Sequence, residues 1–271
     1  MEEPIKVLFI TQEITPFLPE SEIATICRYL PQAVQDRGNE IRAFMPKFVS
    51  INERRNQLHE VQRLSGMNII IDDTDHPLII KVASLPAARI QVYFIDNEDY
   101  FHRRNIVKDT NGVDYKDNGE RAIFFARGVL ETIKKLRWTP DVIHCHGWMT
   151  SLVPLYIKKA YADDPFFKNA KVVYSLYQDH FDQPLQNNFA DILLFNDMKE
   201  TDVNHILKTP VDFQCLQQLA ISYADGIIQG SEHVDESLIQ YTTQEKKHVF
   251  LPYQPTDDYT DAYINFYRSL L

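Results

Sequence analysis

Two histidines and a tryptophan stand close together near the middle of the chain. His144 and His146 are two residues apart at the end of the apolar run Val142–Cys145, which reads as a β-strand, so their side chains share one face of it. Trp148 begins the helix expected next. Ligands of open parallel sheets bind in the crevice at the carboxyl ends of the strands, where imidazoles can hydrogen-bond hydroxyl groups and an indole can pack on a ligand ring. The pattern therefore predicts a ligand-binding crevice with Trp148 at its edge.

Metal ligation is the alternative chemistry for the histidine pair. It is typical of hydrolases built on a (β/α)8 barrel and needs further His and Asp ligands on later strands. The chain has no repeat of eight matched units and no convincing third ligand, so buried, hydrogen-bonded histidines fit better and no metal site is predicted. Asp72-Asp-Thr-Asp75 contains a D-x-D like that of one class of metal-dependent transferases, but strand-like runs flank it and predict a hairpin turn.

Composition excludes several classes of protein. The 271 residues are 44% hydrophobic and 24% charged, and no apolar run approaches a membrane span. The start, Met-Glu-Glu-Pro, is unlike a signal peptide, so a cytoplasmic protein is expected. A net charge of −10 disfavours nucleic acid as a partner. The cysteines at 27, 145 and 215 form no CxxC and are expected to be reduced thiols.

Apolar runs and helical repeats alternate along the chain, which predicts an α/β fold with a doubly wound, mostly parallel sheet. The expected strands are Val7–Thr11, Ile41–Met45, Asn68–Ile71, Leu78–Ser84, Ile90–Ile95, Val142–Cys145, Lys171–Leu176, Gly226–Gly230 and His248–Leu251. The segment Asn52–Glu60 is expected to be a solvated helix or loop, and Asp179–Pro210 an excursion of loops and short helices. No linker divides the chain, so residues 1–271 are predicted to form one domain.

Four segments, in order along the chain, carry a resemblance to a known family. Pro140–Tyr156 resembles the "D-V-V-H-x-H-D-W" turn of bacterial glycogen and starch synthases (glycosyltransferase family 5). Lys6–Pro16 resembles their first strand and turn, Tyr93–Phe101 their "Y-F-[LI]-D-x-x-x-Y-[FY]" segment, and Asp117–Phe125 their "D-N-x-x-R" helix. The resemblance implies the Rossmann-like fold of a GT-B glycosyltransferase. It also implies retaining α-1,4-glucosyl transfer from ADP-glucose or UDP-glucose to a glucan.

The length of the chain limits what the resemblance implies about activity. Synthases of this family are nearly twice as long and hold the sugar nucleotide largely with a C-terminal domain. The 271 residues therefore resemble the N-terminal, acceptor-side half. Residues 257–271 show apolar side chains at helical spacing and are expected to form a C-terminal helix that packs back on this domain. A protein partner supplying the nucleotide half would then be required for activity.

The resemblance and the residue types together nominate a crevice for the acceptor glucan, in which aromatic rings pack on sugar faces and polar side chains bond their hydroxyls. The candidates are His144, His146, Trp148, Tyr93, Asp96, Asp117, Asn118 and Tyr177. No cofactor is implied.

Three departures from the family pattern concern the transferred sugar. The family places Lys-x-Gly-Gly-Leu before its first helix, where backbone N–H groups and the lysine hold a pyrophosphate. Here Pro19 stands in place of the lysine, and Ser21 and Glu22 replace the glycines. The histidine of "T-[IV]-H-N" is missing from Val173–Asp179, and the aspartate of "H-D-W" is Gly147. Nucleotide-sugar binding at this degenerate loop is therefore not favoured.

Two functions remain open from the sequence. The chain could be half of a glucosyltransferase that is inactive alone. The alternative is a non-catalytic protein that binds glucan or partners a true synthase.

Overall fold

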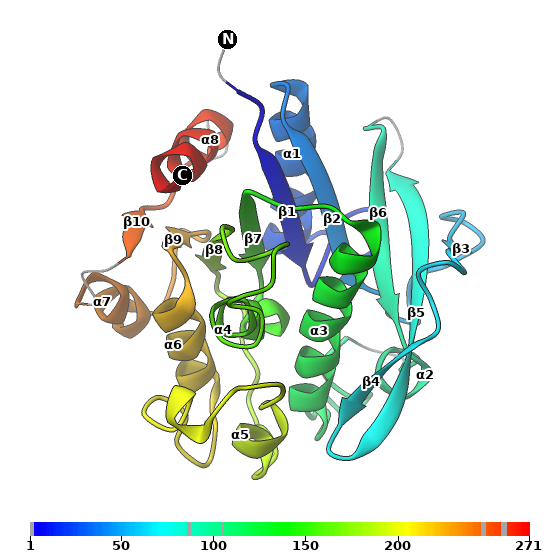
Figure 1. Ribbon diagram of the computed structural model, residues 1–271, viewed down its shortest axis with the longest axis vertical. Helices are drawn as coiled ribbons and strands as arrows, with labels where there is room; N and C mark the ends of the chain where they lie inside the picture. Colours follow the sequence, from blue (N-terminus) through cyan, green and yellow to red (C-terminus); the bar gives the residue numbers. More distant parts are fainter. Residues whose placement is uncertain (1–2, 86–87, 104–105, 245–247, 256–258) are drawn as a thin grey trace.

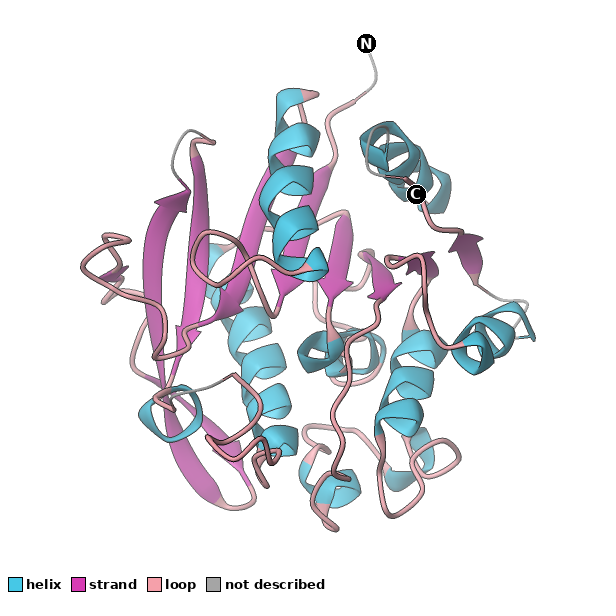
Figure 2. Cartoon of the chain, turned by 180° about the vertical axis from the view of Figure 1, so that it is seen from behind, coloured by secondary structure: helices cyan, strands magenta, loops and turns pink. Residues whose placement is uncertain are grey.

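A mostly parallel β-sheet runs through the molecule and carries helices on both faces (Figures 1 and 2). The computed structural model describes residues 3–85, 88–103, 106–244, 248–255 and 259–271. The strands are β1 Lys6–Thr11, β2 Glu40–Pro46, β3 His59–Glu60, β4 Met67–Ile71, β5 Thr74–Leu85, β6 Ile90–Asp96, β7 Val142–His146, β8 Lys171–Leu176, β9 Gly226–Gln229 and β10 Val249–Leu251. The helices are α1 Glu22–Asp36, α2 Glu98–Phe101, α3 Asn118–Leu136, α4 Leu152–Lys158, α5 Phe189–Ile192, α6 Phe213–Tyr223, α7 Glu236–Gln244 and α8 Tyr259–Leu270, with 3-10 turns η1 Trp148–Thr150 and η2 Glu200–Asp202.

The strand order is β10-β9-β8-β7-β1-β2-β6-β5-β3, with β4 paired to β5. Neighbours from β10 to β6 are parallel, whereas β5 runs antiparallel to β6. Strands β1, β7 and β8 are buried almost throughout because helices cover both faces. Their sequences are therefore mostly apolar, with buried polar exceptions such as His144 and His146. The predicted mostly parallel α/β sheet is confirmed, and every predicted strand is present.

The β4–β5 hairpin confirms the interpretation of the D-x-D segment. Asp72 and Asp73 have φ angles of 48° and 59°, and Ile71 pairs with Thr74 across them. A two-residue hairpin loop with positive φ at both positions matches the right-handed twist of its strands, and aspartate tolerates it. The expectation for Asn52–Glu60 was wrong at its end, because His59 and Glu60 form the short strand β3 on the edge of β5.

Helices α1 and α8 lie on one face of the sheet, and α3, α4 and α6 lie on the other (Figures 1 and 2). The Ser21 hydroxyl caps α1 by accepting the N–H of Ala24 at 3.0 Å. The first turn of α8 is joined to the C-terminal end of α1 by an ion pair of 2.6 Å between Asp261 and Arg37. Phe266 of α8 sits directly against Gly226, where a Cβ would lie 2.8 Å from its ring.

The excursion expected between β8 and α6 is ordered as loops with the short helix α5 and the turn η2, as predicted. Residues 257 and 258, which were expected to begin the last helix, lie outside the described residues. Among the described helices, none has both the length and the apolar character needed to cross a lipid bilayer.

Candidate functional site

The carboxyl ends of β1, β7, β8 and β9 meet the N-terminus of α1, and α8 closes the same edge. In an open α/β sheet this edge is the expected position of a ligand site. The residues there come from segments that are far apart in the sequence, and the parallel register of β1, β7 and β8 brings their ends together.

His144 and His146 are buried side by side beneath this edge. Their rings are 3.8 Å apart between centroids, and neither side chain is accessible to solvent. His144 is held between the hydroxyls of Ser175 and Tyr267, each at 2.7 Å. His146 Nδ1 is 2.6 Å from the hydroxyl of Tyr177, and its Nε2 has no partner among the described residues. The two histidines therefore organise the floor of the crevice.

Burial keeps both imidazoles neutral. Removal from water lowers the pKa of His146 to about 3, because the charged form loses its hydration. Burial also places the pKa of His144 well below its usual value, and the neighbouring His146 adds to the effect. Neutral imidazoles are potential metal ligands, yet the described residues contain no group of three or more His, Cys, Asp or Glu side chains arranged to hold a metal ion.

Trp148 lies beneath the crevice and not at its edge. The side chain is 1% exposed, and its ring packs edge-on against Phe181 at 5.0 Å. The expectation of a ring open at the crevice edge is therefore corrected: in this structure the indole belongs to the core. Its backbone N–H donates to the Asp179 carboxylate at 2.8 Å.

Asp179 is a functional candidate that the sequence did not single out. Burial raises the pKa of its carboxyl to about 6, although the N–H of Trp148 opposes the shift. The carboxylate lines a cavity of about 240 Å³ together with Glu13, Glu22 and Tyr177. A carboxyl with this pKa is half-protonated at about pH 6 and can exchange a proton with a ligand. Its position three residues after the end of the buried strand β8 was the available signal.

The loop before α1 carries no cation in its described contacts. The Ser21 hydroxyl donates to Glu13 at 2.6 Å while it caps the helix, and the Glu22 carboxylate accepts from the hydroxyl of Ser231. Pro19 is exposed. Carboxylates at a helix N-terminus stabilise the helix through its dipole but repel a phosphate.

Tyr93 and Asp96 lie away from the histidines. They belong to β6, which is separated from β7 by β1 and β2, a distance of about 14 Å across the sheet. Tyr93 stacks on Phe44 at 4.9 Å. Asp96, 1% exposed, pairs with Lys81 at 2.9 Å. Tyr93 therefore belongs to the core, and Asp96 to a polar cluster separate from the histidines.

Asp117 and Asn118 lie at the start of α3, and their side chains make structural contacts within the protein. Asp117 receives two N–H groups of Arg103, each at 2.5 Å. Asn118, 2% exposed, accepts from Arg121 at 2.7 Å and donates to the carbonyl of Val107 at 2.9 Å. Of the eight sequence candidates, the structure brings together His144, His146, Trp148 and Tyr177.

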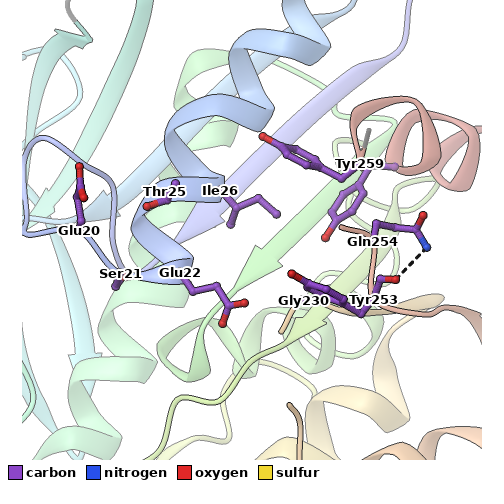
Figure 3. A pocket seen from close by; sticks show the side chains of 10 residues that line it. Glu20, Ser21, Glu22, Thr25, Ile26, Gly230, Tyr253, Gln254 and Tyr259 are labelled. Atoms are coloured by element: carbon purple, nitrogen blue, oxygen red, sulfur yellow. Dashed lines mark hydrogen bonds between the residues drawn. The ribbon is translucent and has the colours of Figure 1, made fainter. Parts of the chain in front are cut away.

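A second cavity, of about 330 Å³, opens between α1 and α8 (Figure 3). Its lining residues are Glu20, Ser21, Glu22, Thr25, Ile26, Gly230, Tyr253, Gln254, Tyr259 and Tyr263. Sequence reasoning missed Tyr253 and Gln254. It assigned Tyr259 and Tyr263 to packing only, because the helical stripe showed that they share a face but not that a cavity lies beside it.

Known proteins resemble the chain over most of its length. The model of a family described as the starch synthase catalytic domain matches residues 6–251. Glycogen synthase of Chlorobium limicola is 43% identical over 173 residues, which are 64% of this chain and 35% of that protein. Glycogen synthase of Chlorobium luteolum is 36% identical over 235 residues, 86% of this chain and 47% of that protein. The chain thus spans less than half the length of these relatives.

One solved structure with the same fold is the catalytic domain of starch synthase IV from Arabidopsis thaliana, bound to ADP and acarbose. It matches with a TM-score of 0.72 at 17% identity, over 92% of this chain and 52% of that chain. The match confirms the predicted fold, that of a GT-B catalytic domain.

Proposed function

Because the chain belongs to the starch synthase catalytic-domain family, we propose that it forms the acceptor-side half of a glycogen or starch synthase. The reaction would be retaining transfer of glucose from ADP-glucose or UDP-glucose to an α-1,4-glucan. The observation that carries the proposal is the family match over residues 6–251, which includes the crevice edge built by β1, β7, β8 and β9. Residues 1–271 would act as one domain, with α8 as part of it.

The nucleotide would be held outside these residues. Transfer needs positive groups around the departing diphosphate, and the loop before α1 presents Glu20 and Glu22 instead. A nucleotide-binding half must supply that charge. If a separate half binds the nucleotide, the acidic loop before α1 does not prevent glucosyl transfer.

The glucan would lie along the rim of the crevice. His144, His146 and Tyr177 are buried and shape the floor, whereas Gln178 and His180 follow β8 and are exposed. Amide and imidazole groups can bond sugar hydroxyls. In this proposal His144, His146 and Tyr177, which were predicted from the sequence, support the rim from below and do not contact the sugar.

Calorimetric titration tests the proposal. We expect maltoheptaose to bind the 271-residue chain and to bind less well after Gln178→Ala and His180→Ala, while ADP-glucose and UDP-glucose give no saturable heat. Glucosyl transfer to glycogen should be absent for the chain alone and should return when it is joined to the C-terminal half of the Chlorobium luteolum relative. A folded fusion that binds ADP-glucose but transfers no glucose would favour the non-catalytic glucan-binding alternative.

A further inference from the structure

The cavity between α1 and α8 has a lining of hydrogen-bond acceptors. Glu22 enters from the first turn of α1, whereas Glu20 lies on the preceding loop, away from the tyrosines (Figure 3). Neither forms an ion pair in the described part of the chain. Among the described residues that line it there is no lysine, arginine or histidine. The amide nitrogen of Gln254 is used by the carbonyls of Pro252 and Tyr253, at 2.9 and 3.3 Å, which leaves its oxygen as the group it can offer.

Tyr263 supplies an independent sign of a ligand. The side chain is only 2% exposed and lines the cavity, yet its hydroxyl has no hydrogen-bond partner among the described residues. Burial raises the pKa of this hydroxyl, with smaller contributions from Cys27, Tyr259, Glu22 and Tyr253. A donor on a ligand in the cavity could bond this hydroxyl.

Aromatic rings complete the wall. Tyr253 and Glu22 extend into the cavity from opposite sides (Figure 3), and Tyr259 packs edge-on with Tyr263 at 5.8 Å between centroids. Tyrosine faces attract cations within about 6 Å. The α1 dipole, about half a positive charge, opposes a cation but is outweighed by two carboxylates.

We propose that this cavity binds a small organic cation that carries a guanidinium group on an alkyl arm. The planar group would donate to the Glu22 carboxylate and the Tyr263 hydroxyl and stack on a tyrosine ring, and the arm would contact Ile26. A phosphate is repelled by the same wall. A neutral sugar could bond the hydroxyls of this lining, but it would bring no positive charge to the Glu22 carboxylate. The cavity adjoins the crevice of the proposed glucosyl transfer, since Ser21 and Glu22 line both it and the cavity beside Asp179.

Titration of the full chain with agmatine tests the assignment. We expect saturable binding that weakens at high salt. Glu22→Gln should weaken it about 10-fold or more, since a bond to a charged group is lost, and Tyr263→Phe about 3-fold to 10-fold. Glu22→Gln keeps an oxygen that accepts from Ser231, and Tyr263→Phe keeps the ring, so both variants should fold, which urea denaturation verifies.

Matched controls lie outside the cavity. Glu60→Gln removes an exposed carboxylate on β3, and Tyr29→Phe removes a hydroxyl from a tyrosine that is 54% exposed on α1; both should leave agmatine binding unchanged. The proposal is overturned if agmatine gives no saturable heat or binds the folded Glu22→Gln variant as well as the unaltered chain. It is also overturned if pyrophosphate or maltotriose binds more tightly than agmatine in a manner that depends on Glu22.

Discussion

The hydroxyl of Tyr267 lies 2.7 Å from Nδ1 of His144, although the two residues are 123 positions apart in the chain. Both side chains are fully buried. The contact ties α8 to the central strand β7, so the last helix contributes directly to the polar network under the crevice.

Removing that hydroxyl should destabilise the protein. Tyr267→Phe leaves a nitrogen of His144 without its partner in a dry interior, which costs about 1 to 3 kcal/mol of unfolding free energy. Tyr29→Phe, at an exposed ring, should change it by less than about 0.5 kcal/mol. Urea denaturation of the two variants measures the difference. Equal effects would show that the bond to His144 contributes nothing.

Stability should fall as the pH drops below about 6.5, the pKa of an unfolded histidine. The folded-state pKa values of His144 and His146 are lowered by burial, to about 3 for His146. Below pH 6.5 the unfolded chain therefore binds two protons that the folded chain does not. Asp179 acts in the opposite direction between about 6 and 3.8, because its folded pKa is raised. Between about pH 6 and 3.8 the unfolded chain therefore binds one proton more than the folded chain. The free energy of unfolding falls by about 1.4 kcal/mol for each pH unit in this range.

Urea denaturation at a series of pH values checks this slope. In His146→Gln the loss below pH 6 should nearly vanish, since the remaining histidine and Asp179 then balance. His59→Gln, at an exposed position, should leave the slope unchanged. A stability that does not vary between about pH 7 and pH 5 would contradict the assignment of two buried neutral histidines.

The sheet could be predicted from the sequence because its parallel strands are buried on both faces. Val7–Thr11 and Lys171–Leu176 are mostly apolar, and the structure places strands there. By contrast, β3 was missed because His59 and Glu60 are both exposed and are held only by backbone pairing with β5. Such a strand leaves no hydrophobic pattern.

The site was harder to predict, since motifs give residues without their spatial order. Tyr93 and Asp96 were grouped with His144, but the sheet order places two strands between them. The direction of the Trp148 ring depends on the backbone at Gly147, whose φ of 84° cannot be read from sequence. The cavity beside Tyr263 likewise arises from how α8 meets α1, a tertiary contact.

Replacing Gly147 by the family's aspartate should be poorly tolerated. Its φ of 84° is strained for any side chain, and a Cβ there would lie 2.5 Å from Cδ of Gln12. Gln12 is 4% exposed and accepts the N–H of Met149 at 3.3 Å, so it cannot move freely. Strain and the weakened bond together predict a loss of about 2 to 4 kcal/mol.

Gly112→Asp is the matched control for that variant. Gly112 also has a positive φ, 78°, but no atom lies within 4 Å of the position of its Cβ. The control reports backbone strain alone, about 1 kcal/mol, and the difference between the two variants reports the collision with Gln12. If thermal denaturation gives the same stability for Gly147→Asp as for the unaltered protein, the structure around Gly147 is wrong.

Deleting residues 256–271 should unfold the domain or leave it unable to melt cooperatively. The deletion removes the buried side chains Tyr263, Phe266 and Tyr267, whose burial contributes several kcal/mol, a large share of the roughly 5 to 15 kcal/mol of a typical domain. It also opens the His144 pair to water and uncovers Gly226 under Phe266. Calorimetry and near-UV circular dichroism provide the measurement. Arg37→Ala, which breaks the exposed pair with Asp261 and a bond to the carbonyl of Ala33, is a mild control. A truncated chain that melts cooperatively at an unchanged temperature would mean that α8 is a docking arm and not part of the fold.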